Sequence, residues 1–263
     1  MRVWLAALLL SASTPSLATP RVVSLSPSLS EMVVELGAAD LLVGRLEAGE
    51  PLPELADVPS VGRYGQLDME RLLSLQPDLL LLWPGSVGVA QREQLRNLNI
   101  PTFTAEPASL DQLADQVEAL AIALGRPQRG REQATQLRQR LAQLREQYRT
   151  DVPVRVFYQV WDQPLYTIGG GQIISDALAV CGASNMFDHL KLPAPQVGIE
   201  SVLQRNPEVI IAGTQAQLDA WKAWPQIDAV KHGRLLLLAD KGLERPSGQM
   251  LEATARLCEQ LQR

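Results

Sequence analysis

The sequence predicts an α/β protein made of two similar lobes with mostly parallel sheets, joined by one long helix. Three observations support this prediction. Short apolar runs that suit buried strands alternate with helical patterns, and one helix–proline–acid–strand pattern occurs twice. A helical stretch without strand signals separates the two copies. We expect an N-terminal lobe at residues 19–124, a bridging helix at 125–150 and a C-terminal lobe at 151–263.

The first 18 residues are typical of a cleaved secretory signal peptide. Arg2 gives a basic start, residues 3–10 form an apolar run, and residues 16–18 make a small-residue cleavage site. The run is shorter than the roughly 20 apolar residues that span a bilayer. A buried N-terminal helix is disfavoured because Pro15 follows closely. We therefore expect an exported protein, and no lipid anchor, because no cysteine lies near the cleavage site.

The next residues belong to the first lobe. Residues 21–27 form a β-rich run that ends in a turn, and residues 28–36 place apolar side chains at helical spacing before Gly37. Residues 41–44 are the next strand candidate. A loop rich in proline, glycine and glutamate follows at 47–62.

The most informative pattern is the one that repeats. Residues 68–76 predict a short helix, Pro77 and Asp78 a turn, and residues 79–83 a buried strand. The same order returns 130 residues later, in residues 200–212. The matched positions are Glu70 with Glu200, Leu72 with Val202, Leu73 with Leu203, Pro77 with Pro207, Asp78 with Glu208, and Leu79, Leu80 and Leu81 with Val209, Ile210 and Ile211. Two lobes of one design are the simplest explanation, and ligand sites in such sheets lie beyond the carboxyl ends of the strands.

A helical stretch lies between the two copies. Its apolar residues step three and four positions apart, first over residues 110–124 and again over residues 134–148, with a break at 125–127. The second series ends just before the strand candidate at 155–158, which opens the second half of the chain as residues 21–24 open the first. A stiff helical connector of this kind would allow little hinge closure.

Charge and cysteine content narrow the possible functions. The chain of 263 residues has a formal charge of −5, which gives no electrostatic basis for binding nucleic acid. Its only cysteines are Cys181 and Cys258, and an even number in an exported protein favours a disulfide. A bridge across this separation would contribute about 4 kcal/mol in the chain-entropy model. Two buried free thiols are the alternative.

These residues resemble the periplasmic binding proteins of iron-siderophore, haem and vitamin B12 importers, and most closely their cobalamin-binding (BtuF-type) branch, over residues 20–263. The first lobe carries the motifs PRVVSLSP (20–27), MERL (69–72) and QPDL (76–79), the last of which leads to Trp83. The second lobe carries RVF (155–157), VCG (180–182), NMF (185–187), PQV (195–197) with Glu200, and ER (244–245) before Cys258. The resemblance implies a class III periplasmic binding protein, in which one long helix bridges two Rossmann-like lobes and the ligand lies between them.

The resemblance also implies roles for individual residues. It implies a Cys181–Cys258 disulfide, and it places Glu70 and Glu200 where family members present one glutamate per lobe to arginines on the permease subunits of an ABC importer. Matched acids on two lobes suit a two-fold transporter. Acids in the first turn of a helix are also common for another reason, because the helix dipole favours them.

The implied ligand is cobalamin or another corrinoid, a broad and mostly apolar disc for which aromatic side chains are the natural walls. Tyr64, Trp83 and Trp161 are the candidates for these walls. Trp83 and Trp161 end matching predicted strands of the two lobes, and Tyr64 lies in the loop before the Glu70 helix, where the resemblance implies a ligand-facing aromatic residue. Arg245 and Asp240 are candidates for contacts with the polar edges of the ligand.

Some aromatic positions of the cobalamin branch are occupied differently in this sequence. Residues 48–51 contain no tyrosine, and Ala194 stands where a ligand-facing tryptophan is expected. Trp161 is a candidate substitute, and haem or a ferric siderophore is the alternative ligand within the same superfamily. Trp221 and Trp224 flank a polar helix and are interpreted as structural.

Other functional classes fit less well. A zinc or manganese site needs about three histidines and an acid, whereas only His189 and His232 are present. A secreted hydrolase with an unrecognised site would use Ser26, but the sequence has no Gly-x-Ser-x-Gly elbow. The glycines at 169–171 favour a tight turn over a phosphate site. An adaptor of the cell envelope is a third class. We expect a monomeric, non-enzymatic periplasmic binding protein without metal, cofactor or membrane insertion after signal removal.

Overall fold

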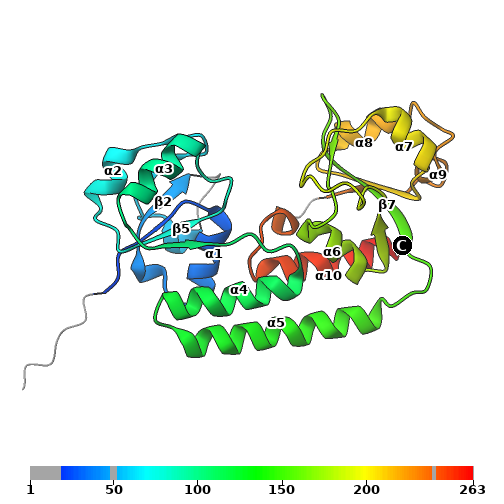
Figure 1. The fold of residues 1–263 in the computed structure, drawn as a ribbon. Helices are drawn as coiled ribbons and strands as arrows, with labels where there is room; N and C mark the ends of the chain where they lie inside the picture. The colour runs from blue at the N-terminus through cyan, green and yellow to red at the C-terminus, as the bar shows by residue number, and fades with distance from the viewer. Residues whose placement is uncertain (1–18, 48–51, 239–240, 263) are drawn as a thin grey trace, which may run out of the picture.

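The structure is a computed structural model that describes residues 19–47, 52–238 and 241–262. The predicted signal peptide at 1–18 lies outside these ranges, as do residues 48–51 and Asp240. Two α/β lobes stand side by side above a pair of long helices, α4 (Leu110–Ala123) and α5 (Pro127–Gln147) (Figure 1). The predicted fold class is confirmed.

The N-terminal lobe is built on a sheet in the order β4-β3-β2-β1-β5-β6, in which β4 alone pairs antiparallel. Its strands are β1 (Val22–Ser24), β2 (Leu42–Glu47), β3 (Ser60–Arg63), β4 (Gln66–Leu67), β5 (Leu79–Leu82) and β6 (Thr102–Thr104). Its helices are α1 (Pro27–Glu35), α2 (Met69–Ser74) and α3 (Val89–Asn97), with short 3-10 turns η1 (Ala39–Leu41) and η2 (Pro53–Leu55).

The C-terminal lobe repeats this plan with a sheet in the order β11-β10-β7-β8, and β9 pairs with the first part of β7. Its strands are β7 (Val154–Trp161), β8 (Tyr166–Thr167), β9 (Ala183–Asn185), β10 (Val209–Ala212) and β11 (Leu235–Leu237). Its helices are α6 (Ile173–Val180), α7 (Ile199–Arg205), α8 (Gln215–Trp221), α9 (Asp228–Lys231) and α10 (Gln249–Leu261), with a 3-10 turn η3 (Lys241–Glu244).

The central strands form where the sequence is continuously apolar. All four residues of β10 are buried, and so are the last three of β5, because helices cover both faces of a parallel sheet. The helix α1 begins at a proline in its first turn, and the chain leaves it through Gly37, whose φ of 66° lies in the left-handed region. The short strand, helix and turn predictions for these segments are therefore confirmed to within a few residues.

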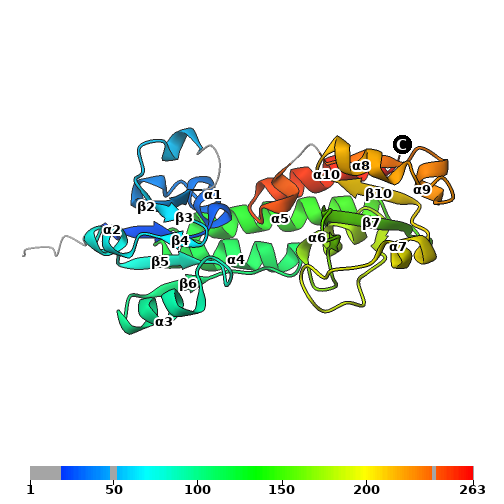
Figure 2. The same cartoon turned by 90° about the horizontal axis from the view of Figure 1, so that it is seen from above.

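The connection between the lobes has two long helices where the sequence predicted one. The backbone N–H of Leu110, at the start of α4, donates to Asp176 Oδ2 in α6 of the C-terminal lobe, at 2.8 Å. From there α4 runs back to the N-terminal lobe, and α5 returns beside it, as the view from above shows (Figure 2). Gly130 permits this close approach, because a methyl group there would clash with Ala121.

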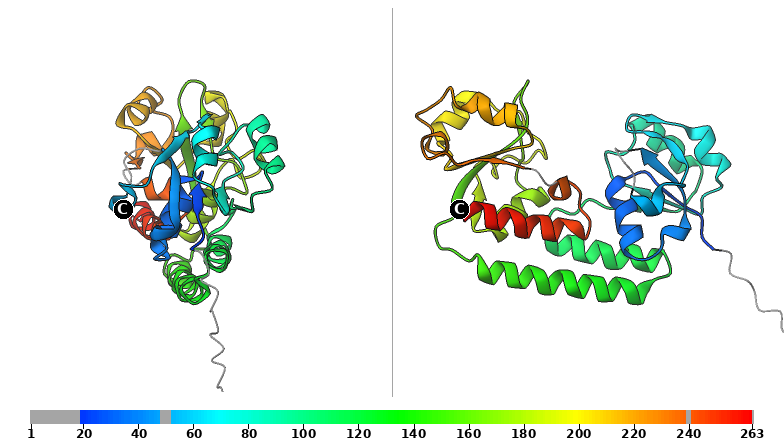
Figure 3. Two further views of the ribbon diagram at one scale, coloured as in Figure 1. Left: turned by 90° about the vertical axis from the view of Figure 1, so that its left-hand side faces the viewer. Right: turned by 180° about the vertical axis from the view of Figure 1, so that it is seen from behind.

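One apolar core is shared by both lobes. It contains side chains of α1 and α4, of α5, and of α6 and α10 from the C-terminal lobe. Viewed along the long axis, the α4–α5 pair lies to one side of the sheets, where it can contact both lobes (Figure 3). Smaller clusters on the other faces belong to one lobe each. None of the helices in the described ranges combines the length and the apolar character that a membrane span requires.

The two cysteines form the predicted disulfide. Cys181 follows α6 and Cys258 lies in α10, with 2.02 Å between their sulfur atoms, and both residues are buried. The bridge fastens α10, the last helix of the chain, to the first helix of the C-terminal lobe. The alternative of two free thiols is thereby excluded.

Candidate functional site

The carboxyl edges of the two sheets approach each other at a joint between α1 and the η3–α10 segment. Two residues separate the end of β1 from the start of α1, and η3 follows the end of β11. Arg245 Nη1 donates to Glu31 Oε1 of α1 at 2.8 Å, and Ser247 Oγ donates to Glu31 Oε2 at 3.1 Å. The strand ends of both lobes therefore border the same region, which is where ligands bind in sheets of this type.

Three exposed aromatic side chains lie at these carboxyl edges. Tyr64 directly follows β3 and Trp83 directly follows β5, whereas Trp161 is the last residue of β7 in the other lobe. Their exposed fractions are 67%, 41% and 59%, respectively. Large aromatic side chains left open to solvent at strand ends of both lobes form a surface that an apolar disc can cover.

The turn after β5 fixes the position of Trp83. Its backbone N–H donates to Ser86 Oγ at 2.8 Å, and the N–H of Ser86 donates back to the carbonyl of Trp83 at 2.8 Å. The indole ring lies against Gly85, where a methyl group would overlap the ring. Any side chain at this glycine would displace the indole.

Whereas Trp83 lies in the turn between β5 and α3, Trp161 lies in a β-hairpin. It pairs with Tyr166 across the β7–β8 hairpin, and this hairpin lies on the side of the C-terminal lobe that faces the N-terminal lobe (Figures 1 and 3). Tyr64 occupies the corresponding kind of position in the first lobe, in the turn between β3 and β4. By contrast Trp221 is buried and donates from Nε1 to Gln159 at 2.7 Å, which agrees with its structural interpretation.

Arg245 has a protein partner that the sequence did not reveal. Glu31, which binds it, has a side chain only 6% exposed, while the arginine side chain is 37% exposed. The guanidinium therefore neutralises a buried carboxylate and still reaches solvent at the joint. A buried acid left without this partner would be costly. Asp240, the other predicted rim residue, is outside the described residues.

A second carboxylate of α1 reinforces the same joint. Glu35 Oε2 accepts from the backbone N–H of Gly248 at 2.8 Å and from Gln133 Nε2 at 3.3 Å, so it caps α10 and touches α5. Burial raises the pKa of Glu35 above its ordinary value, and hydrogen bonds from Gly248 and Gln249 oppose that rise. Sequence reasoning missed both acids, although Glu31 and Glu35 are spaced i, i+4 and are the only charged residues of this helix.

The raised pKa of Glu35 predicts a pH effect on stability. The carboxyl of Glu35 is harder to ionise in the folded protein than in the unfolded chain. The free energy of unfolding therefore falls as the pH rises from the pKa of this group in the unfolded chain through its pKa in the folded protein. Glu35→Gln keeps an acceptor for Gly248 but cannot ionise. The stability of this variant relative to the wild type should therefore increase as the pH rises above the ordinary pKa range of a glutamate, measured by urea unfolding.

Glu132→Gln is the matched control, because Glu132 is an exposed acid on α5 near the same joint. It should leave the pH dependence unchanged. A relative stability of Glu35→Gln that stays level or falls over this pH range would contradict the prediction.

Glu70 and Glu200 occupy matching places in the first turns of α2 and α7. Both side chains are exposed, and neither carboxylate has a hydrogen-bond or ion-pair partner among the described residues. Helix α2 is capped instead by Asp68, which accepts from the backbone N–H of Arg71 at 2.9 Å. The two glutamates are thus free to meet an external partner.

A groove in the described part of the chain lies elsewhere. It has a volume of about 600 Å³ and runs between α1, α5 and α10. Its lining mixes charged and polar side chains, such as Glu35, Arg129 and Glu252, with the apolar side chains of Leu137 and Leu251. None of the predicted ligand-binding residues lines it, so it is separate from the aromatic surface at the strand ends.

The other candidate sites have structural explanations. The backbone N–H groups of Gly169 and Gly170 donate to the carbonyls of Pro193 and Leu190, so they are not available to a phosphate. Ser26 Oγ contacts Ser28 Oγ, whereas His189 and His232 bind groups of the C-terminal lobe. Within the described ranges, no cluster of three or more histidine, cysteine or acidic residues could hold a metal ion.

Comparison with known proteins identifies relatives over nearly the whole chain. A family model described as periplasmic binding protein matches residues 22–241. The chain is 36% identical over 261 residues to a vitamin B12-binding protein of Yersinia pestis (strain Pestoides F), covering 97% of this chain and 91% of that one. It is 33% identical over 253 residues to a vitamin B12-binding protein of Vibrio cholerae serotype O1, with 93% and 92% coverage.

Solved structures agree with these sequence matches. The crystal structure of the periplasmic vitamin B12 binding protein BtuF of Vibrio cholerae superposes with a TM-score of 0.84 and 32% identity, covering 92% of this chain and 96% of that one. The periplasmic haem-binding protein HutB of Vibrio cholerae superposes with a TM-score of 0.80 at 19% identity, covering 94% of this chain and all of that one, and it shares the fold.

Proposed function

The chain belongs to the periplasmic binding protein family, and on this premise we propose that it captures cobalamin or a related corrinoid between its lobes and delivers it to the permease of an ABC importer. One observation carries the ligand part of this proposal: exposed aromatic side chains end strands of both sheets at the edges that border the inter-lobe joint. The vitamin B12-binding proteins to which the chain is similar support the same class of ligand.

Each aromatic residue would contact the ligand from a defined direction. Tyr64 and Trp83 belong to the N-terminal lobe, and Trp161 to the C-terminal lobe, so a flat macrocycle would be held from both sides. Arg245 would meet a polar edge of the corrin with the part of its guanidinium that Glu31 leaves exposed. Asp240 is proposed as the neighbouring rim contact.

Glu70 and Glu200 are proposed as the docking residues for the permease. Each is an exposed carboxylate on the first turn of a short helix, at equivalent places of two similar lobes. Such a pair would set the orientation of the protein on a two-fold symmetric partner whose surface carries arginines. The physiological form would be a soluble monomer in the periplasm, released after removal of residues 1–18 and acting without enzymatic turnover.

The proposed ligand is tested by titrating the mature protein with cyanocobalamin, cobinamide, haemin and a set of ferric siderophores, following tryptophan fluorescence. We expect one-to-one saturation by a corrinoid. Saturation by haemin or a siderophore alone would keep the importer role and refute the corrinoid assignment. These ligands have to be compared because Ala194 stands where a ligand-facing tryptophan is expected. Turnover of a ligand would support the hydrolase instead.

Two variants show whether the aromatic surface is the site. Trp83→Ala should weaken corrinoid binding by about tenfold or more, as for a buried aromatic anchor. Gly85→Ala should also weaken it, although it retains the indole, because the added methyl group displaces the ring. Trp224→Ala in the other lobe is the control and should bind normally, so equal losses in all three variants would contradict the assignment.

A further inference from the structure

The helices that carry Glu70 and Glu200 have little apolar anchoring of their own. Helix α2 has six residues and α7 has seven, and Leu72 and Val202 are their only buried side chains. Helices of this length are unstable in isolation. Their orientation therefore depends strongly on what holds their carboxyl-terminal ends.

Both helices end in the same irregular geometry. Gln76 and Asn206 have positive φ angles of 44° and 49°, and each precedes a proline and then an acid. Non-glycine residues in the left-handed region are uncommon and need support from neighbouring contacts. The acid that follows supplies such a contact in each lobe.

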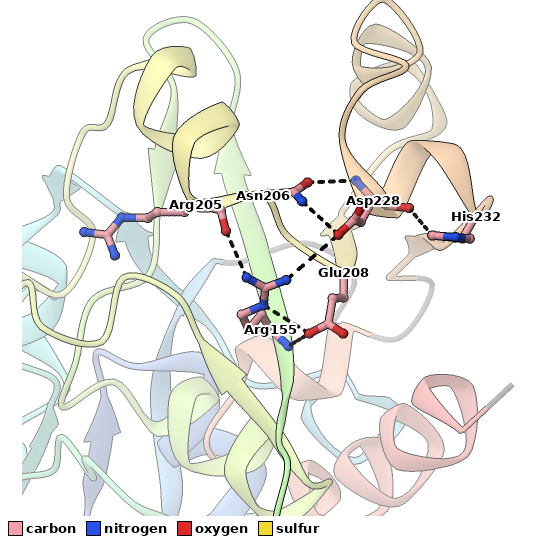
Figure 4. A network of polar contacts seen from close by, with 6 residues as sticks. All are labelled: Arg155, Arg205, Asn206, Glu208, Asp228 and His232. Atoms are coloured by element: carbon pink, nitrogen blue, oxygen red, sulfur yellow. Dashed lines mark hydrogen bonds and ion pairs between the residues drawn. The ribbon is translucent and has the colours of Figure 1, made fainter.

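Arg155 makes the contact in the C-terminal lobe (Figure 4). Its backbone N–H and its Nε both donate to Glu208 Oε2, at 2.9 and 3.2 Å, and its Nη1 donates to the carbonyl of Arg205 at 3.5 Å. Asn206 binds Asp228 at 2.8 Å, and Asp228 lies 4.0 Å from Arg155 Nη2. The last residue of α7 is thus tied to the first strand of the lobe, and the Arg155 N–H and guanidinium hold the pKa of Glu208 below its ordinary value.

Arg21 makes the same contact in the N-terminal lobe. Its backbone N–H donates to Asp78 Oδ2 at 2.8 Å, and its Nε donates to the carbonyl of Leu75, the residue directly after α2, at 2.7 Å. The N–H of Asp78 donates back to the carbonyl of Arg21 at 2.8 Å, as that of Glu208 does to Arg155 at 2.9 Å. The repetition in two lobes of different detailed sequence indicates a common requirement.

We propose that Arg21 and Arg155 are positioning residues for docking: each fastens the end of a glutamate-bearing helix to the first strand of its lobe, so that Glu70 and Glu200 meet the permease at a fixed separation. This proposal rests on the docking role proposed above for the two glutamates. Exposed ion pairs such as that of Arg155 with Glu208 contribute little stability, and the Arg21 side chain makes one exposed hydrogen bond to a carbonyl. The effect of the arginines should therefore fall on the geometry of these helices and not on folding.

The separation of the helices can be measured without any importer. Nitroxide labels are attached to Glu70→Cys/Glu200→Cys, in which the native Cys181–Cys258 bridge leaves no other free thiol, and the distance distribution is recorded by pulsed EPR. Arg21→Ala and Arg155→Ala should each broaden this distribution, and the double variant should broaden it further. Arg96→Ala, which removes an exposed pair with Glu93 on α3, should leave it unchanged.

A docking measurement then distinguishes the positioning role of the two arginines from the docking role of Glu70 and Glu200. With a purified vitamin B12 importer in nanodiscs, Arg21→Ala should weaken binding of the protein roughly tenfold, yet cause no further loss when Glu70→Ala is already present. Arg21→Lys should restore little, because an ammonium lacks the planar donor geometry. Cyanocobalamin affinity should stay within error in every variant.

The outcomes are distinct. Unchanged distance distributions in both arginine variants would overturn the positioning role. Broadened distributions together with normal docking of Glu70→Ala and Glu200→Ala would keep the arginine contacts as anchors of the helices and refute the docking proposal. Additive losses in the Arg21→Ala/Glu70→Ala pair would show that Arg21 acts independently of Glu70, and would also overturn the inference.

Discussion

Reversal of charge at both Glu70 and Glu200 should abolish delivery of the ligand through the importer, while the affinity of the purified protein for that ligand stays within experimental error. Both carboxylates are exposed and have no partner among the described residues, so folding does not depend on them. In Glu70→Lys/Glu200→Lys, a lysine at each position would face the arginines proposed on the permease, so repulsion would replace attraction at both contacts. The measurement is uptake of labelled cyanocobalamin into proteoliposomes, with equilibrium titration of the same variant.

Net charge changes by the same amount in a matched control. Glu93→Lys/Glu259→Lys reverses one exposed acid on α3 and one on α10, and so leaves both α2 and α7 unchanged. It should transport normally at physiological ionic strength, where distant surface charges are screened. If this control lost transport as fully as Glu70→Lys/Glu200→Lys, the effect would be one of overall charge. If ligand affinity fell in Glu70→Lys/Glu200→Lys, the glutamates would belong to the binding site.

Loss of the Cys181–Cys258 bridge should lower the free energy of unfolding by about 4 kcal/mol, since the bridge closes a separation of 77 residues. The double variant Cys181→Ala/Cys258→Ala avoids leaving buried polar groups at two fully enclosed positions. Its transition midpoint in urea should fall accordingly, with circular dichroism as the probe. Ligand binding at low temperature should persist, because α6 and α10 also pack through their apolar faces.

The cross-link and the lost side-chain volume have to be separated. Wild-type protein reduced under denaturing conditions and refolded with its thiols blocked from reoxidation keeps both sulfur atoms. It should share most of the stability loss if the cross-link is responsible. A reduced protein that unfolds at the same urea concentration as the oxidised one would contradict the chain-entropy explanation.

Local sequence patterns predicted the elements of this fold well. The helix and strand around Pro77 and their copies around Pro207 lie where the pattern placed them, because proline and the following acid mark the turn in each lobe. The disulfide followed from an even cysteine count and the family resemblance. The place of Trp83 at the end of a buried strand was also predicted, and the structure shows it there, 41% exposed.

Contacts between distant segments could not be predicted in the same way. The spacing of leucines in residues 110–124 identifies an apolar face of α4, but it does not say that both lobes share that face. Glu31 looks like an ordinary helical acid in the sequence, and only the packing of α1 against the start of α10 brings Arg245 and Ser247 to it. Ligand contact by the aromatic residues, and docking by the glutamates, stay predictions for the same reason.

The apolar core that both lobes share bears on the energetics of ligand capture. Because α4, α5 and α10 pack into one core, and Glu31 and Glu35 add polar contacts at the joint, we expect the separation of the lobes to change little when the proposed ligand binds. Little free energy is then spent on reorganising the protein, so association approaches the rate of diffusional encounter. Differences between ligands appear mainly as differences in residence time. In the proposed importer role, the free energy for releasing the ligand would then come from the importer and not from a conformational change of this protein.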